Sequence, residues 1–479
     1  MLRDDSLYFF MTQLINRLDR QYLWHPFTPY DKWFDPSYEP LVLERAEGCY
    51  LYDASKKKYW DGNSSIWTTT HGHRHPRLIK AIVNCLEQLD HVSFLGNTHS
   101  WAVNLGQTLV SMVSKGYPVN YRVFFSDNGS TAVEAAIKIA WQALQQRKER
   151  QRNLILCLKG GYHGDTVGAM SVSSIPFQSR FKDLLFNTLP VAAPSCFHCP
   201  WNRSLRERGW DARLTRKCSW ECLEELKKTL DKNKHRLAAM IMEPRIQGAS
   251  GMWMHPEGYI KEAFQLVKQS GAFFIVDEVF TGMGRAGERI AASLKENVFA
   301  DIICFAKGLS GGTLPIAATL VREEIFESFK GGYTEAFLHG HSYTANPLAC
   351  AAADENLKIF EEENTFHRIA ILSQHLRSYA QVFWNHPLVG DVRVEGAVLA
   401  VEILRNKRNF KCDPSFDIGW MVSERAKAYG LVTRPIKDVL IVVPPYCSSR
   451  EDIEGMISAL YQALNDILPP KKYSSSSLP

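Results

Sequence analysis

The amino-acid sequence predicts an α/β protein with two parts: a large domain on a mostly parallel sheet wrapped by helices, and a smaller α+β domain. Short continuous apolar runs bounded by polar or glycine-rich residues are typical of strands covered on both faces. From about residue 100 to 340 such runs alternate with helical patterns, which indicates a parallel sheet between helices. After residue 346 a long helical stretch is followed by separate strands, and this change predicts the second domain.

The predicted domain boundaries follow these changes of pattern. Residues 1–75 form an N-terminal segment that contributes to the small domain and to the functional site, with an antiparallel unit over residues 41–62. Residues 76–345 form the large domain, and residues 346–479 form the C-terminal small domain. The small domain is therefore expected to combine both ends of the chain beside a large central domain.

Each predicted strand is a short run of apolar residues. The candidates in the large domain are residues 121–125, 154–158, 238–242, 272–276 and 302–305. The candidates in the C-terminal part are residues 398–403 and 439–443, followed by a helix from about Arg450. An amphipathic helix is predicted after Pro76, because Leu78, Ile82, Leu86 and Leu89 share one stripe.

Composition and charge exclude several function classes. The chain has 479 residues, of which 45% are hydrophobic and 22% charged, as in ordinary soluble globular proteins. Its formal charge of +5 is small, and no dense Lys/Arg cluster is interleaved with aromatic residues, so nucleic acid is not an expected partner. No apolar stretch is as long as a membrane span, and the N-terminus is too acidic for a secretory signal. We therefore expect a cytoplasmic protein without membrane partners, with Met11 as an alternative start and a disordered tail at Ser474–Ser477.

The eleven cysteines favour a reducing compartment, because their number is odd and they are scattered through apolar stretches. Four of them are clustered: Cys196, Cys199, Cys218 and Cys222. Four thiolates at this spacing could hold zinc tetrahedrally, or the segment is a loop that happens to contain thiols. The sequence leaves these two alternatives open and assigns no metal.

Two predicted strands end in side chains of opposite charge. The run 272–276 leads into Asp277, and the run 302–305 leads, through Ala306, into Lys307. Because ligands of open α/β sheets bind outside the carboxyl ends of the strands, these two side chains are expected in one crevice. Pyridoxal phosphate needs this pair, a lysine for a Schiff base and an acid facing the pyridinium nitrogen. Apolar surroundings should lower the pKa of Lys307, although the alternative is a surface salt bridge between two strand ends.

Two further segments suit a flat, phosphorylated cofactor. Gly129 and Ser130 follow a strand and open a helix, where backbone amides and hydroxyls bind phosphate, although an ordinary helix cap is the alternative. Tyr162 lies near glycines at a strand end and can stack on a ring, or it plugs a tight turn. After another predicted strand, Gln247 could bond a phenolic oxygen and Glu243 could orient a neighbouring group.

The chain resembles the class III pyridoxal-phosphate aminotransferases over nearly its whole length. The matching motifs are residues 277–285, residues 307–312 and residues 339–347. The resemblance implies the fold type I of pyridoxal-phosphate enzymes and a homodimer with active sites shared between subunits. It also assigns roles to individual residues: Lys307 as Schiff-base lysine, Asp277 as partner of the pyridinium nitrogen, Gly129 and Ser130 as phosphate ligands, Tyr162 as stacking residue, and His341 and Ser342 as residues that reach the phosphate in the other subunit.

Within this family the chain looks most like the members that aminate 8-amino-7-oxononanoate to 7,8-diaminononanoate in biotin synthesis. The marks are residues 24–28, 61–67, 161–166 and 433–435. The resemblance implies substrate contacts by Phe27, Ile66, Trp67, Tyr162, Lys307, Gly340 and Arg434. Arg434 matches the arginine that binds the substrate carboxylate, a role that bidentate guanidinium bonding suits. The alternatives are an ω-amino-acid aminotransferase acting on ornithine or 4-aminobutyrate, an aminomutase, or a scaffold protein without the cofactor.

The amino donor stays open between S-adenosylmethionine and lysine. Members that use S-adenosylmethionine commonly have Tyr at the position of Phe27 and two tryptophans at the position of Ile66-Trp67. The chain lacks that hydroxyl and one of the aromatic faces that attract a sulfonium cation. It also has Ala306 and Lys437 where glycine is usual, and the second change is expected to reshape the carboxylate end of the site.

Overall fold

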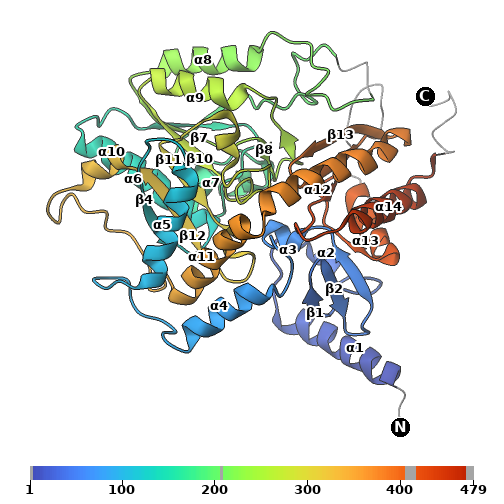
Figure 1. The fold of residues 1–479 in the computed structure, drawn as a ribbon. Coiled ribbons are helices and arrows are strands. Elements are labelled where there is room, and N and C mark those ends of the chain that lie inside the picture. Colours follow the sequence, from blue (N-terminus) through green and yellow to red (C-terminus); the bar gives the residue numbers. More distant parts are fainter. Residues whose placement is uncertain (1–3, 205–208, 405–416, 471–479) are drawn as a thin grey trace.

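The computed structural model describes residues 4–204, 209–404 and 417–470 (Figure 1). Met1 and the Ser474–Ser477 tail lie outside these described residues. The described helices are α1 (Asp4–Tyr22), α2 (Tyr30–Trp33), α3 (Ser64–Trp67), α4 (Pro76–Leu86), α5 (Ser100–Ser114), α6 (Gly129–Gln146), α7 (Val167–Ser171), α8 (Glu221–Asn233), α9 (Tyr259–Gln269), α10 (Glu323–Phe326), α11 (Pro347–Glu362), α12 (Thr365–Tyr379), α13 (Ile418–Ala426) and α14 (Arg450–Ile467).

The central sheet has the strand order β4-β12-β11-β10-β7-β5-β6. Its strands are β4 (Tyr121–Ser126), β5 (Leu154–Leu158), β6 (Leu189–Val191), β7 (Leu237–Met242), β10 (Phe273–Asp277), β11 (Ile302–Phe305) and β12 (Ala317–Arg322). Neighbours from β11 through β6 are parallel, whereas β12 is antiparallel to both β11 and β4. The mostly parallel sheet that the sequence predicts is therefore confirmed, while β6 and β12 were not predicted.

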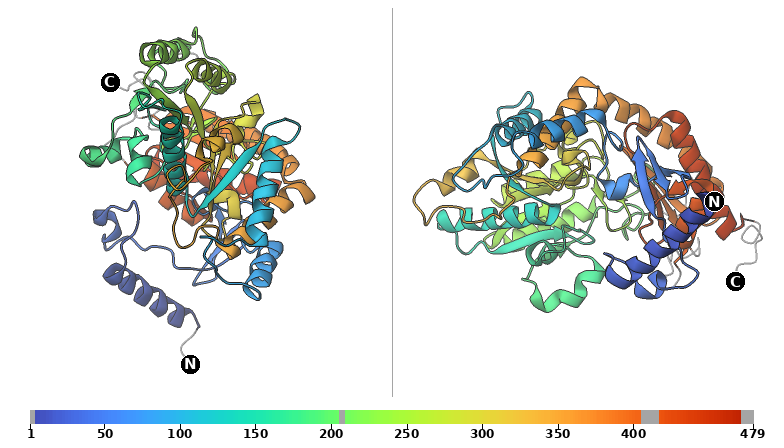
Figure 2. Two further views of the ribbon diagram at one scale, coloured as in Figure 1. Left: turned by 90° about the vertical axis from the view of Figure 1, so that its left-hand side faces the viewer. Right: turned by 90° about the horizontal axis from the view of Figure 1, so that it is seen from below.

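Helices cover both faces of this sheet (Figure 2). Successive side chains of a strand point to opposite faces, so each strand has apolar residues to bury on both sides. In β10, Phe274 and Val276 join the main buried cluster with side chains of α5, α9 and α11. Phe273 and Ile275 join a second cluster with the apolar face of α6. The large domain is thus a sheet between two helical layers. The carboxyl ends of its parallel strands lie at the same edge of the sheet.

The remaining strands are built from both ends of the chain. The first sheet, of order β1-β2-β3-β15, pairs N-terminal strands β1 (Leu43–Glu47), β2 (Tyr50–Asp53) and β3 (Lys58–Asp61) with C-terminal β15 (Leu431–Val432). The second, β13-β14-β16, comprises β13 (Val389–Glu395), β14 (Val398–Ile403) and β16 (Val439–Val442). A short hairpin pairs β8 (Ile246–Gln247) with β9 (Trp253–Met254). The predicted strands at 398–403 and 439–443 and the helix from Arg450 are confirmed.

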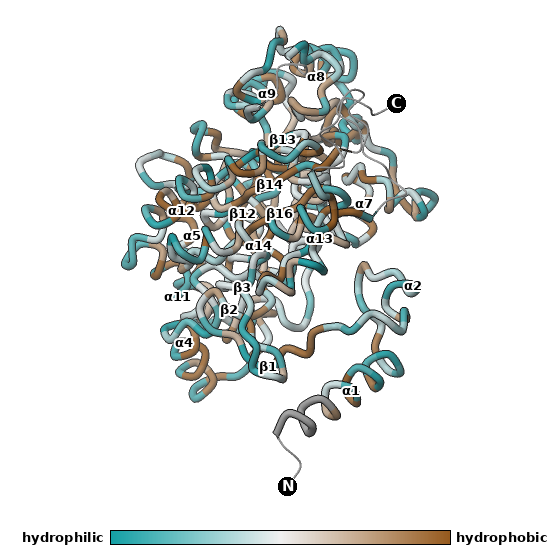
Figure 3. The backbone as a smooth tube through the Cα atoms, turned by 90° about the vertical axis from the view of Figure 1, so that its right-hand side faces the viewer, coloured by the Kyte–Doolittle hydropathy of each residue, from teal (hydrophilic) through white to brown (hydrophobic). Residues whose placement is uncertain are grey.

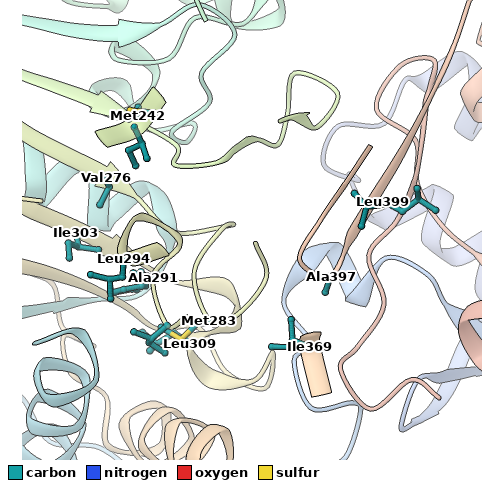
Figure 4. Packing of buried hydrophobic residues seen from close by; sticks show 14 of the residues in the cluster. Met242, Val276, Met283, Ala291, Leu294, Ile303, Leu309, Ile369, Ala397 and Leu399 are labelled. Atoms are coloured by element: carbon teal, nitrogen blue, oxygen red, sulfur yellow. The ribbon is translucent and has the colours of Figure 1, made fainter. Parts of the chain in front are cut away.

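One apolar cluster joins the two parts of the molecule. Figure 4 shows it running from Val276 and Ile303 of the central sheet, past Met283, to Leu399 of β14. The C-terminal part therefore packs against the large domain through one common hydrophobic core.

The N-terminal helix α1 projects from this body (Figure 3). Phe10 and Tyr22 on it are 63% and 73% exposed, and Trp24 just after it is 83% exposed. Among the described residues, no helix is both long and apolar enough to cross a membrane.

Candidate active site

A cavity of about 490 Å³ opens at the carboxyl edge of the central sheet. It is lined by six residues that the sequence predicts as site residues: Trp67, Gly129, Ser130, Tyr162, Asp277 and Lys307. They come from five separate segments of the chain, and the fold brings them together. We call Asp277, Lys307, His163 and Glu243 the inner wall of the cavity.

Asp277 and Lys307 follow neighbouring strands. Asp277 ends β10 and lies opposite Cys304 of β11, and Lys307 comes three residues later. The Lys307 amine lies 4.6 Å from the centre of the Trp67 ring and 5.5 Å from that of Phe280. Desolvation by these surroundings lowers the pKa of Lys307 to about 8, against the opposing charges of Asp277 and Glu243. About a tenth of the amine is therefore neutral, and nucleophilic, at pH 7, far more than for a lysine with the ordinary pKa.

Asp277 is held by a histidine to which the sequence analysis assigned no role. His163 Nδ1 lies 2.7 Å from Asp277 Oδ2, and both residues are only 3% exposed. The other carboxylate oxygen accepts a bond from the amide of Val279, at 3.1 Å. The signal in the sequence is the position of His163, which follows strand β5 between Tyr162 and Gly164 at the same sheet edge. This partner fixes the carboxylate in one orientation.

Glu243 anchors the segment that carries Tyr162. Its two oxygens accept bonds from the amides of Tyr162, at 3.1 Å, and Gly248, at 2.9 Å. Burial raises the pKa of Glu243 to about 7, with Asp277 adding to the rise and His163 opposing it. Glu243 therefore acts on the position of the Tyr162 backbone, while the phenol donates to Asp165, at 2.7 Å.

The start of α6 forms a cradle for an anion. Asn128 caps the helix by accepting from the amide of Thr131, and the amides of Gly129 and Ser130 precede that bond. Ser130 Oγ accepts from the amide of Asp165, at 3.2 Å, so its own hydrogen stays available to a ligand. A Cβ at Gly129 would lie 2.7 Å from the Val279 side chain, so the close packing here requires glycine.

Phe27, Ile66 and Arg434, which the sequence predicts as site residues, do not line the cavity. Together with Phe177, whose ring centre lies 6.2 Å from that of the lining residue Tyr162, we call them the mouth. Phe27 and Ile66 are 58% and 45% exposed, and an Arg434 Nη2 donates to the Phe27 carbonyl, at 3.2 Å. Ile66 belongs to α3, a single turn in which residues 64–67 all have positive φ between 45° and 68°. The structure thus places Arg434 and Phe27 in contact across 407 positions of sequence.

Two contacts hold this left-handed turn. Ser64 Oγ donates to the carbonyl of Val443, at 2.6 Å, and Trp67 Nε1 donates to Asn63 Oδ1, at 2.9 Å. The Trp67 ring packs on Phe280, with 4.5 Å between ring centres. The indole is therefore fixed as one side of the cavity beside the Lys307 amine.

Lys437, close to Arg434, has φ +54°. This left-handed conformation favours glycine, so a lysine adopts it here at an energetic cost.

Some predicted site residues lie elsewhere. Gln247 is fully buried, donates to the Lys159 carbonyl at 3.0 Å and contacts His255, and it does not line the cavity. Its bond to a phenolic oxygen stays a prediction. Gly340, His341 and Ser342 are exposed outside the cavity lining, and His341 Nε2 lies 3.8 Å from Asp127 of the same chain.

The four clustered cysteines are free thiols, and three of them, Cys196, Cys199 and Cys222, are buried. Within the residues that the structure describes, no group of three or more His, Cys, Asp or Glu side chains is arranged to hold a metal ion.

The donors of the cavity fit pyridoxal 5'-phosphate. The start of α6 offers amides and a hydroxyl for a phosphate, Asp277 offers a buried carboxylate for a pyridinium nitrogen, and Lys307 offers an amine of lowered pKa. Tyr162 lines the same cavity with an aromatic ring. Each group that the cofactor requires is present at the carboxyl edge of one sheet.

Comparisons with known proteins agree with this chemistry. Residues 33–464 match the family described as Aminotransferase class-III. The adenosylmethionine-8-amino-7-oxononanoate aminotransferase of Anoxybacillus flavithermus is 39% identical over 93% of this chain and 95% of its own length. The crystal structure of the enzyme of that name from Methanocaldococcus jannaschii superposes with a TM-score of 0.86, at 34% identity, over 95% of this chain and 99% of that one. An amine transaminase from an uncultivated Pseudomonas species, solved with pyridoxal phosphate bound, gives a TM-score of 0.85 at 29% identity, over 93% of this chain and 99% of that one.

Family, fold and site therefore lead to one conclusion. The chain belongs to the class III aminotransferases, and it is a transaminase whose cofactor is pyridoxal 5'-phosphate.

Proposed function

We propose that the chain transfers an amino group to 8-amino-7-oxononanoate and forms 7,8-diaminononanoate, a step of biotin synthesis. The observation that carries this proposal is the distribution of charge in the site, with an amine of lowered pKa in the inner wall and Arg434 at the mouth. A substrate with a ketone at one end and a carboxylate at the other fits that arrangement. The relatives named for this reaction support the same substrate.

The residues of the inner wall divide the proton work. The bound cofactor supplies an electron sink. Lys307 Nζ, as a free amine, takes and returns the proton at the reacting carbon of the substrate. Asp277 Oδ keeps a proton on the ring nitrogen facing it, and the His163 Nδ1 contact keeps that carboxylate oriented.

The mouth binds and orients the acceptor. Arg434 is proposed to pair with the substrate carboxylate through its guanidinium. Trp67 lies against the Lys307 amine, and its apolar face excludes water from the reacting end. The amine and the guanidinium thus hold opposite ends of one substrate.

The test is a pair of half-reactions with the cofactor-loaded protein. We would mix the protein separately with S-adenosylmethionine and with lysine, and follow transfer of the amino group to the cofactor by absorbance. 8-Amino-7-oxononanoate is then added, and 7,8-diaminononanoate is identified by mass spectrometry. We expect one of the two donors to load the cofactor and the oxo acid to unload it. Loading by ornithine or 4-aminobutyrate alone, without formation of the diamine, would refute the assignment.

We further propose a homodimer in which His341 and Ser342 of each subunit reach the cofactor phosphate of the other. Large apolar side chains lie exposed on α1 and on the connecting segments, among them Trp24, Leu95 and Tyr333, and such surfaces are typical of subunit interfaces. The proposed subunit keeps the predicted domains at 1–75, 76–345 and 346–479, and works in the cytoplasm.

Subunit mixing tests this sharing of sites. A Lys307→Ala chain and a chain carrying His341→Ala and Ser342→Ala are unfolded and refolded together. If the sites are shared, mixed dimers contain one intact site and recover activity that neither variant has alone. Recovery no greater than the sum of the separate variants would refute the sharing, and sedimentation equilibrium reports the dimer itself.

A further inference from the structure

Phe177 is an exposed aromatic residue of the mouth, and the proposed function names no substrate contact for it. It lies on the 3-10 turn Pro176–Leu184, and 48% of it is exposed. Its ring centre lies 6.2 Å from that of Tyr162 and 5.8 Å from that of Phe27. Phe177 therefore bridges two aromatic residues that are far apart in the sequence.

The two neighbours of Phe177 belong to the two ends of the site. Tyr162 lines the cavity together with Lys307. Phe27 accepts the Arg434 bond through its carbonyl. The three rings are thus neighbours in series, from Tyr162, which lines the cavity, through Phe177 to Phe27, whose backbone carbonyl accepts from Arg434. Phe177 and Phe27 stay 48% and 58% exposed, so this aromatic surface is open to an apolar ligand.

We propose that Phe177 determines specificity by packing against the methylene chain of the substrate between the amine of Lys307 and the guanidinium of Arg434. This inference rests on the proposed function, because it assumes a substrate with both a ketone and a distant carboxylate. Each methylene group that leaves water for an apolar surface strengthens binding by about fourfold. A substrate that is long enough to span both ends gains this contact, whereas a shorter ω-amino acid that reaches Lys307 loses either the ring or the guanidinium.

The test compares Phe177→Ala with Phe181→Ala, a matched control. Phe181 lies on the same turn and is 46% exposed, and within the described part of the chain it makes no ring contact with another aromatic residue. We expect Phe177→Ala to raise KM for 8-amino-7-oxononanoate by about tenfold with little change in kcat, and Phe181→Ala to leave both unchanged. Phe177→Leu should recover most of the affinity, since it restores an apolar surface. Cofactor content and near-ultraviolet circular dichroism check that each variant is folded.

A second substrate separates the role in chain binding from a general effect. With an oxo acid shortened by two methylene groups, Phe177→Ala should change KM less than it does with the full-length substrate. Equal KM values for Phe177→Ala and Phe181→Ala would overturn the inference, and so would a fall in kcat alone. If the unaltered protein fails to convert 8-amino-7-oxononanoate, the proposed function itself is refuted, and this result is distinct from an active protein that is indifferent to Phe177.

Discussion

The inner wall of the cavity and its mouth are built in opposite ways. Asp277 and His163 of the inner wall are each 3% exposed, and they follow strands of one sheet. Phe27 and Ile66 of the mouth are 58% and 45% exposed, and their backbones are left-handed. Phe27, Ile66 and Arg434 of the mouth come from both ends of the chain, whereas Phe177 comes from the large domain. The comparison teaches that the groups proposed for the reaction lie on the buried sheet, whereas the groups proposed for substrate selection lie on exposed segments with unusual backbone conformations.

The largest effect is expected from removal of the amine of the inner wall. Lys307→Ala should reduce both half-reactions by ~10³-fold or more, because it removes the amine that is proposed to move the proton at the reacting carbon. Lys358→Ala on α11, outside the cavity lining, is the control and should stay active. Borohydride reduction of the cofactor-loaded protein followed by peptide mapping should label Lys307. A label on another lysine would show that Lys307 does not bind the cofactor and that the inner wall is not the reacting part of the site.

The next effect concerns the carboxylate of the inner wall. Asp277→Asn removes the negative charge and should lower kcat of both half-reactions by ~10²–10⁴-fold, with KM little affected. His163→Gln, which keeps a donor but changes its reach, should lower kcat by less. Stopped-flow measurement of each half-reaction provides the values. A change in KM for one substrate only would contradict the assignment of catalysis to the inner wall and of substrate binding to the mouth.

Substitution at the mouth should act on KM. Arg434→Gln removes a charged hydrogen bond to the carboxylate and should raise KM for 8-amino-7-oxononanoate by ~10–100-fold, with kcat nearly unchanged. The methyl ester of the same acid carries no charge there, so the substitution should barely alter its conversion. An equal loss of conversion with the acid and with the ester would show that Arg434 stabilises the fold and does not bind the substrate carboxylate.

The smallest effect is a shift along the pH axis. Burial lowers the pKa of Lys307 to about 8, whereas the contact with Asp354 raises the pKa of Lys358. An amine reacts as its neutral form, so labelling of the cofactor-free protein at Lys307 should rise with pH around pH 8 and reach half its maximum there. Lys358 should reach half its maximum at a higher pH. Competitive acetylation with quantitative peptide mapping compares the two, and coincident curves would contradict a desolvated inner wall.

The inner wall could be predicted largely from the sequence, because its side chains directly follow strands. Asp277 and Lys307 come after apolar runs, and parallel strands end at one edge, so their meeting follows from the pattern alone. The contact of His163 with Asp277 could not be predicted from the sequence, since it joins positions 114 residues apart. The sequence offers only the proximity of His163 to the same edge.

The small domain was harder to predict, because buried charges hide a strand. Strand β13 contains Asp391, Arg393 and Glu395, and all three are buried. Arg393 pairs with Asp391 at 2.9 Å and with Glu402 at 2.7 Å, so the polar residues satisfy one another inside the protein. A pattern of apolar residues cannot reveal such a strand, since its burial depends on partners elsewhere in the chain.

The left-handed turn α3 has a consequence for the position of Trp67. Non-glycine residues adopt positive φ at an energetic cost, so four in succession persist only where neighbouring structure enforces them. In this turn, the Ser64 hydroxyl donates a hydrogen bond to the backbone carbonyl of Val443, just after β16, and this contact holds the conformation. The position of Trp67 beside the Lys307 amine therefore depends on the backbone of the C-terminal part as well as on the cavity itself.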